Sequence, residues 1–333
     1  MKSRKLFYLT TFVIIVLILI AISYFAVSRY IHKIPSVSHD VIVEIPKGTG
    51  LKDISSKLKE SGVIKSDMIF ILYVMNEGWQ DELKAGEYEF KKNATISDVV
   101  DQIVAGDVLL YQITIPEGLT VKEIAKLLHQ KGVVTETAFL EEAQNQELIK
   151  ELLGPGATSL EGYLFPETYS YSKSLTSKEL IVLMVERFKA VYGPLSHLRN
   201  NINLSDREIL TLASIIEKET GAGFERPLIS AVFQNRLKIG MKLDSDPTVI
   251  YGMGENYNGN LRRRHLRERT EYNTYVIKGL PPGPIANPGK DSILAVLNPA
   301  DVKYLYFVSK GDGTHHFSHS YREHQRAVYK YQR

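Results

Sequence analysis

Val43-Glu44-Ile45-Pro46-Lys47-Gly48 begins a short unit that continues through Leu51-Lys52-Asp53-Ile54 and Leu58 to Gly62-Val63. The unit recurs 70 residues later, with eight identical positions, as Ile113-Thr114-Ile115-Pro116-Glu117-Gly118, Val121-Lys122-Glu123-Ile124, Leu128 and Gly132-Val133. Each copy predicts a strand ended by Pro, a Gly turn, and a helix whose apolar residues fall at i, i+3 and i+7 before a Gly cap. Two copies are too few for a solenoid. The predicted strands and helices together indicate an α+β fold.

The repeated unit resembles a LysM-like module, the strand-helix element that commonly binds N-acetylated glycan chains. A purely structural unit without a ligand explains the same pattern equally well. Between the copies, turn residues followed by alternation predict a strand over residues 83–90, and a helix is expected over 95–105. We place a LysM-like subdomain at 39–108, and the second copy can belong either to this subdomain or to the domain on its C-terminal side.

The N-terminal segment is one apolar run from Leu6 to Ser28 that contains no charged residue. As a helix its 23 residues reach roughly 35 Å, enough to cross the hydrocarbon core of a lipid bilayer. A cleaved signal peptide would have a shorter apolar stretch of about 7–15 residues and a small-residue cleavage site. We therefore expect a cytoplasmic tail at 1–5, an uncleaved anchor in the cytoplasmic (inner) membrane at 6–28, a linker at 29–38 and an extracytoplasmic remainder.

The composition of the 333 residues excludes several classes of function. Cysteine is absent, which excludes disulfide frameworks, thiolate zinc sites, iron-sulfur clusters and cysteine nucleophiles. The net charge of +3 is small, and the densest basic run, residues 262–267, is expected outside the cytoplasm. We therefore interpret that run as a solvated surface or a contact with anionic wall polymer or lipid headgroups, and expect no nucleic-acid partner.

Four histidines near the C-terminus raise the possibility of a zinc hydrolase: His315, His316, His319 and His324. No carboxylate stands at a recognised zincin spacing from them. The preceding Gly311-Asp312-Gly313 predicts a hairpin turn into a strand, where these side chains would alternate between faces. We expect no metal and no other cofactor.

A chemically suggestive helix begins at Ser205, where Ser205-Asp206-Arg207-Glu208 fits a capping box, and runs to Thr220. Glu217 and Glu219 border its broad apolar face on opposite flanks. A carboxyl held against apolar side chains has a raised pKa and can keep a proton near neutral pH, as a general acid must. A salt bridge to an arginine is the structural alternative for either glutamate. The two side chains point in nearly opposite directions and cannot flank one glycosidic bond, so one glutamate would act alone.

The run Leu212-Ala213-Ser214-Ile215-Ile216-Glu217-Lys218-Glu219-Thr220 resembles the signature of the endolytic murein transglycosylases, the YceG-like (MltG) family. Six further stretches resemble the same family in the same order, at residues 160–169, 233–237, 243–252, 272–275, 279–285 and 304–308. The resemblance implies a mixed α+β catalytic domain at 109–333 and selects Glu217 as its catalytic residue.

The resemblance also implies the chemistry. The glutamic acid protonates the glycosidic oxygen between N-acetylmuramic acid (MurNAc) and N-acetylglucosamine (GlcNAc). As a carboxylate it then takes the proton from the muramic C6 hydroxyl while that oxygen attacks C1. Cleavage within peptidoglycan strands would leave 1,6-anhydro-MurNAc ends and limit the length of nascent strands.

Several polar and aromatic residues are candidates for binding the glycan. Short polar side chains beside a Pro suit hydrogen bonds to sugars, although an ordinary capped turn has the same composition. The tyrosines can equally be half-buried packing, and two glutamates can equally pair with arginines. The candidates are Ser245, Asp246, Thr248, Tyr251, Tyr272, Asn273, Thr274, Tyr275, Glu161 and Glu167. The Pro-rich stretches at 280–284 and 287–289 are interpreted as structural.

A non-catalytic scaffold is the alternative from a different functional class. Such a protein would hold peptidoglycan through the repeat and recruit the synthases. In either case the expected partners are glycan strands, penicillin-binding synthases and the cell elongation machinery, besides the bilayer around residues 6–28.

Overall fold

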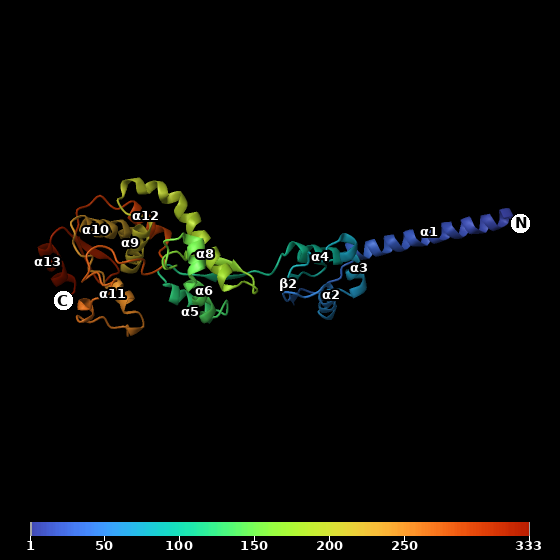
Figure 1. Ribbon diagram of the computed structural model, residues 1–333, viewed down its shortest axis with the longest axis horizontal. Helices are drawn as coiled ribbons and strands as arrows, with labels where there is room; N and C mark the ends of the chain where they lie inside the picture. The colour runs from blue at the N-terminus through green and yellow to red at the C-terminus, as the bar shows by residue number, and fades with distance from the viewer. Residues whose placement is uncertain (1, 333) are drawn as a thin grey trace. The chain divides into compact units, whose positions relative to one another are not determined.

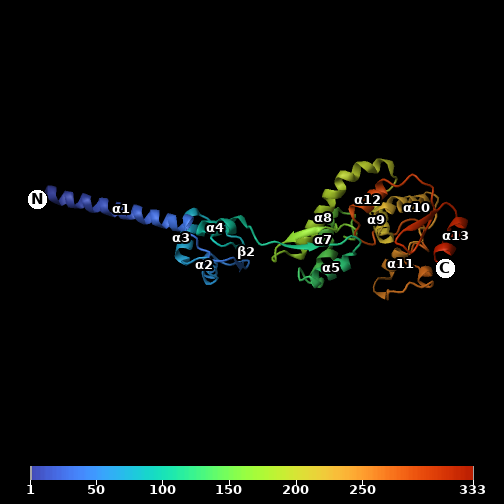
Figure 2. The same ribbon diagram turned by 180° about the vertical axis from the view of Figure 1, so that it is seen from behind.

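The structure is a computed structural model that describes residues 2–332 (Figures 1 and 2). Within these residues it contains thirteen α-helices and three two-stranded sheets, β1–β2, β3–β4 and β5–β6. The predicted mixed α+β class is confirmed. The chain divides into two compact units, residues up to 111 together with 170–174, and residues 112–169 together with 175 onward.

The first unit contains one sheet and four helices. Strand β1 (Val41–Ile45) pairs antiparallel with β2 (Gly86–Phe90), so that Val41 lies opposite Phe90. Thr95 caps helix α4 with a capping box, and Ser66 caps α3. The buried residues of both strands and of the helices form one core. The helices are α1 (Lys2–Lys33), α2 (Leu51–Glu60), α3 (Asp67–Glu77) and α4 (Ile96–Ala105).

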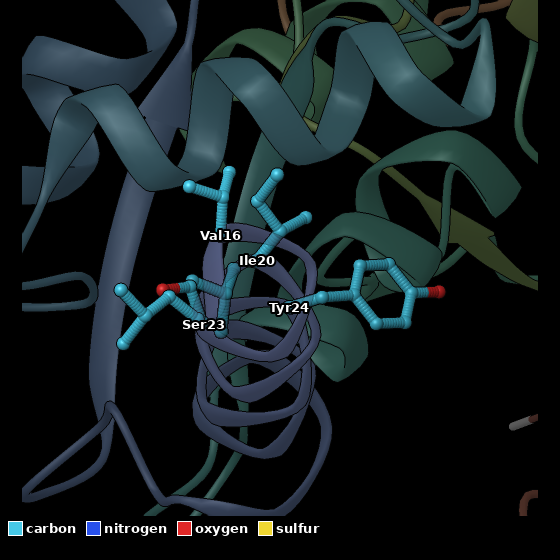
Figure 3. A pocket seen from close by; sticks show the side chains of 6 residues that line it. Val16, Ile20, Ser23 and Tyr24 are labelled. Atoms are coloured by element: carbon cyan, nitrogen blue, oxygen red, sulfur yellow. The ribbon is translucent and has the colours of Figure 1, made fainter. Parts of the chain in front are cut away.

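Helix α1 contains the predicted apolar span. Its stretch Leu6–Lys33 contains an 18-residue window with a mean hydropathy of 2.8, and nothing covers that window. Length and composition suit a helix that crosses a membrane, as an anchor or as a signal sequence. Figure 3 shows a shallow hollow on this helix whose lining, which includes Val16 and Tyr24, comes from α1 alone. The helix continues past Ser28, where the predicted membrane span ends, and Ile31 is buried in the core of the first unit.

The second unit surrounds helix α9 (Asp206–Glu219). The predicted capping box is present, since the Ser205 hydroxyl accepts from the Glu208 amide and the Glu208 carboxylate accepts from the Ser205 amide. Residues 209–216 are all buried, and α9 packs against α10 (Arg226–Lys238), α11 (Asp246–Met253) and α12 (Lys290–Leu297) (Figure 1). Glu217 and Glu219 therefore lie in the last turn, where the helix leaves the core.

The remaining elements include two short sheets. The boundary between the two units falls within strands β3 and β4, and β5 and β6 form the predicted hairpin. The remaining elements are β3 (Tyr111–Thr114), α5 (Val121–Gln130), α6 (Glu136–Gln144), α7 (Gln146–Leu153), β4 (Thr168–Tyr171), α8 (Ser177–Tyr192), η1 (Gly193–Asn201), η2 (Gly223–Glu225), η3 (Gly254–Asn256), η4 (His265–Arg267), β5 (Tyr306–Ser309), β6 (His315–Ser318) and α13 (Tyr321–Tyr331).

Both copies of the repeat form a strand followed by a helix, β1 with α2 and β3 with α5. Gly62 and Gly132 follow the two helices with φ of 74° and 70°, the left-handed conformation that ends a helix. Most of the second copy, from residue 112 onward, belongs to the unit that contains α9. A glycan-binding role for the first copy stays a prediction.

Candidate active site

Glu219 lies beside two of the segments that the sequence marks as glycan-binding. Ser245, the N-cap of α11, donates its hydroxyl to Glu219 Oε1 at 2.5 Å. The next residue, Asp246, accepts at Oδ1 from the Tyr275 hydroxyl at 2.7 Å. Asp246 is exposed, and Glu219 and Tyr275 are half-buried. The last turn of α9, the start of α11 and the 272–275 turn thus bring polar groups together around one carboxyl.

The surroundings of Glu219 favour its protonated form. Burial, together with the negative charge of Asp246, raises the pKa of Glu219 to about 7. The hydrogen bond from Ser245 and the positive charge of Arg236 act in the opposite direction. With a pKa near neutrality, this carboxyl can give up a proton and take one back at the same pH.

Three of the predicted binding residues hold this arrangement together from inside. Thr248, Asn273 and Thr274 are fully buried. The Thr248 hydroxyl lies 2.8 Å from that of Thr274, whose Oγ1 also accepts from the Ser245 amide at 3.0 Å. These contacts fix the start of α11 against the 272–275 turn, so the three residues position the site from its interior.

Glu217 has a different environment, although it lies two residues away. Its side chain is 6% exposed, and its Oε1 accepts from Arg226 Nη2 at 3.0 Å. Its Oε2 accepts from the Gly289 amide, at the N-terminus of α12, at 2.9 Å. Both oxygens therefore have partners, one a guanidinium and the other a backbone amide.

Arg226 also connects Glu217 to Glu117, whose Oε2 lies 3.6 Å from Arg226 Nη2. Burial and the negative charge of Glu217 raise the pKa of Glu117. A Cβ on Gly289 would lie 1.8 Å from Glu117 Oε1, so a larger residue there would displace the Glu117 side chain. Sequence reasoning missed Arg226 and Glu117. One signal was available for Glu117: the two copies of the repeat differ in charge at this turn position, which is Lys47 in the first copy.

Glu161, a predicted cleft residue, is buried beneath this region. It accepts from the Val121 amide at 3.1 Å, the Tyr251 hydroxyl at 3.2 Å and the Asn287 amide group at 3.2 Å. Burial raises the pKa of Glu161 to about 7. Tyr251 in turn packs against Tyr272, with ring centroids 4.8 Å apart. The cavity beside Glu161 holds about 30 Å³, which has room for one water and none for a sugar.

Asn287 connects this buried carboxyl to the segments around Glu217. Its side chain also accepts from the Leu164 amide at 2.9 Å and donates to the Leu119 carbonyl at 2.8 Å. Its backbone carbonyl, two residues before Gly289, accepts from the Gly118 amide. The 287–289 stretch is thus structural, as predicted from its Pro and Gly content, and it also provides a contact to Glu217.

Glu167 takes the arginine-paired alternative, because both of its carboxylate oxygens contact Arg187. No contact of Glu167 reaches either glutamate of α9 in the described chain.

Among the histidines near the C-terminus, His315 Nδ1 lies 2.7 Å from Glu225 Oε2. Within residues 2–332, no group of three or more potential metal ligands comes together.

Replacing Glu161 by Gln should change how stability depends on pH. The folded state holds this proton up to about pH 7, whereas an unfolded glutamate releases it near its ordinary value of 4.5. The free energy of unfolding should therefore fall by about 3 kcal/mol for this group as pH rises from 4.5 to 7. In Glu161→Gln that contribution is absent, so the difference in urea midpoint between variant and wild type should change across this window. A difference in urea midpoint that stays constant across this pH range would contradict the raised pKa of Glu161.

Comparison with known proteins gives one consistent family. The model of the YceG-like family matches residues 43–330. An endolytic murein transglycosylase of Bacillus subtilis is 32% identical over 306 residues, which are 87% of this chain and 84% of that protein. The protein of the same name from Streptococcus pneumoniae is 31% identical, over 86% of this chain and 58% of its own length. The crystal structure of a YceG-like protein from Listeria monocytogenes superposes with a TM-score of 0.59 at 31% identity, over 86% of this chain and 98% of that one.

Proposed function

The chain belongs to the YceG-like family, and from that premise we propose that it is a membrane-anchored lytic transglycosylase of peptidoglycan. It cleaves the bond between MurNAc and GlcNAc within glycan strands and leaves 1,6-anhydro-MurNAc ends. The relatives' names support the substrate and the reaction class. The observation that carries the proposal is the carboxyl of Glu219, which burial gives a pKa of about 7, beside Ser245 and Asp246.

The proton donor we propose is Glu219, and Glu217, which the family resemblance selects, is the alternative. A general acid needs a proton and access to the substrate. Glu219 has a raised pKa and lies next to the exposed Asp246. Glu217 is partly buried like Glu219, but both of its oxygens are already bonded, to Arg226 and to the Gly289 amide. The geometry therefore supports Glu219 as the acid and Glu217 as a residue that holds α9 to α10 and α12.

In the proposed reaction, the protonated Glu219 gives its proton to the glycosidic oxygen as the bond from that oxygen to muramic C1 breaks. The muramic O6 forms the new bond to C1, and its hydroxyl proton passes to the Glu219 carboxylate, which restores the starting state. No water is consumed. The Ser245 hydroxyl, 2.5 Å from Oε1, stabilises the carboxylate between the two proton transfers.

The location of the substrate follows from α1. A helix that anchors the chain in the cytoplasmic membrane, with the rest outside, would keep the active site near nascent strands as the synthases release them. Cleavage there would set strand length, and contact with penicillin-binding synthases would follow. The anchor role and these partners are part of the proposal.

The rate of cleavage should depend on pH through Glu219. It should be level below about pH 7 and fall above it, because only the protonated acid starts the reaction. Asp246→Asn removes a negative charge that raises the pKa of Glu219, so the fall should begin at a lower pH. Asp301→Asn, at an exposed site, is the matched control. Identical profiles for wild type and Asp246→Asn would contradict the role of Glu219.

A further inference from the structure

A hollow of about 540 Å³ lies at the C-terminal end of α11, away from Ser245. Helix α11 contributes Gly252 and Met253 to its wall, and the loop around η4 contributes Arg264, Arg267 and Glu268. Its volume falls in the range that binds small molecules or short peptide segments. The eight residues of α11 put the hollow roughly 12 Å from the residues around Glu219, about the length of one disaccharide.

The charges around this hollow form no ion pairs in the described part of the chain. Five arginines, 262, 263, 264, 267 and 269, are exposed, and none lies within 4.0 Å of a carboxylate among residues 2–332. The carboxylate of Glu268 forms no ion pair there either, although it shares the lining with Arg264 and Arg267. Elsewhere in this unit Arg187, Arg226 and Arg236 do pair with acids. The hollow thus presents two guanidinium groups and one carboxylate to solvent.

The backbone and one guanidinium of this wall are held in place. Arg264 Nε lies 3.1 Å from Nε2 of the buried His265. The side-chain amide of Asn273 donates to the carbonyls of His265 and Glu268, at 3.1 and 2.7 Å. Asn273 also precedes Thr274, which contacts Ser245. The hollow and the surroundings of Glu219 are therefore built on one buried frame, and a guanidinium held in place in advance, as in Arg264, loses less entropy when it binds.

We propose that this hollow binds the peptide stems that branch from muramic acid in peptidoglycan strands. Arg264 and Arg267 receive a stem carboxylate, whose planar geometry matches the guanidinium fork, and Glu268 receives an ammonium group of the stem. This inference rests on the proposed function and gives it a substrate class, strands that still carry stems. A phosphate polymer fits less well, because Glu268 would repel it and the charges of the hollow are mixed.

The test compares two substrates with the full chain in detergent micelles. One is uncrosslinked glycan with its stems, and the other is the same glycan after an amidase has removed them. The wild type should cut stem-bearing strands with the higher kcat/KM. In the double variant Arg264→Gln, Arg267→Gln this preference should fall about tenfold, the effect of losing one charge-assisted contact. The double variant Arg322→Gln, Arg326→Gln, two exposed arginines on α13, is the matched control and should keep the preference.

A wild type without a preference, or a preference that survives in the Arg264/Arg267 variant, would overturn the inference. Direct binding separates that failure from a failure of the proposed function. A free stem tetrapeptide with a carboxylate and a side-chain ammonium is titrated against each chain. Binding of the tetrapeptide should be lost in the Arg264/Arg267 variant and weakened by Glu268→Gln. When the side-chain ammonium of the tetrapeptide is acetylated, Glu268→Gln should cause no further weakening. If glycerol phosphate binds as tightly as the tetrapeptide, and Glu268→Gln strengthens that binding, the hollow would be reassigned to phosphate polymers. This conclusion would hold even if no chain cut glycan.

Discussion

Glu219→Gln should slow glycan cleavage by at least about a hundredfold, because the amide keeps the shape of the side chain and cannot supply the proton. The Ser245 hydroxyl can still donate to the amide oxygen, so the fold around the site is retained. The measurement is the rate of strand cleavage by the full chain at pH 6, where the wild-type carboxyl is mostly protonated.

Glu217→Gln is the comparison that separates the two glutamates of α9. It removes the charge that pairs with Arg226 and should lower both stability and rate, but leave measurable cleavage with an unchanged pH profile. The reverse result, with Glu219→Gln active and Glu217→Gln inactive, would restore the choice made by family resemblance. If neither the wild type nor the variants cut strands while all of them bind strands equally, the scaffold function would replace the enzyme.

Asn287→Ala should be the most destabilising single change in the described site. It removes hydrogen bonds to the Leu164 amide, the Leu119 carbonyl and Glu161, all in a fully buried position. Loss of these partners should cost on the order of 2–5 kcal/mol, since buried polar groups are left unsatisfied. The urea midpoint of the second unit, followed by circular dichroism, measures it.

Asn298→Ala provides the matched control for this stability effect. Asn298 is exposed at the end of α12, and its replacement should change stability by less than about 0.5 kcal/mol. Equal effects of the two substitutions would show that the contacts of Asn287 do not hold the 117–121 and 287–289 segments together.

Local sequence patterns predicted the elements of the fold well. The capping box at Ser205, the strand at 86–90 and the helix after Thr95 depend on residues close together in the chain, and all three are present. Hydropathy bounds the apolar span at Ser28 but does not predict where the helix ends. The helix continues to Lys33, and Ile31 packs against a core that forms only when distant residues fold together.

The site was harder to predict, because its chemistry depends on distant partners. Helix geometry placed Glu217 and Glu219 alike at the border of the apolar face. They differ because Gly289, 72 residues on, binds Glu217, whereas Ser245 and Asp246 face Glu219. Similarly, nothing local in the sequence distinguishes Glu161, which is buried among amide and hydroxyl donors, from Glu167, which pairs with Arg187.

The most direct test of the proposed reaction is the mass of the products. The full chain is incubated with uncrosslinked strands, with Glu219→Gln as the blank, and the fragments are weighed by mass spectrometry. We predict anhydro-ended fragments, each lighter by one water than a hydrolysis product, in the wild type and none with Glu219→Gln. Fragments that carry the added water would contradict the intramolecular attack of the muramic C6 hydroxyl and make the protein a hydrolase of the same bond.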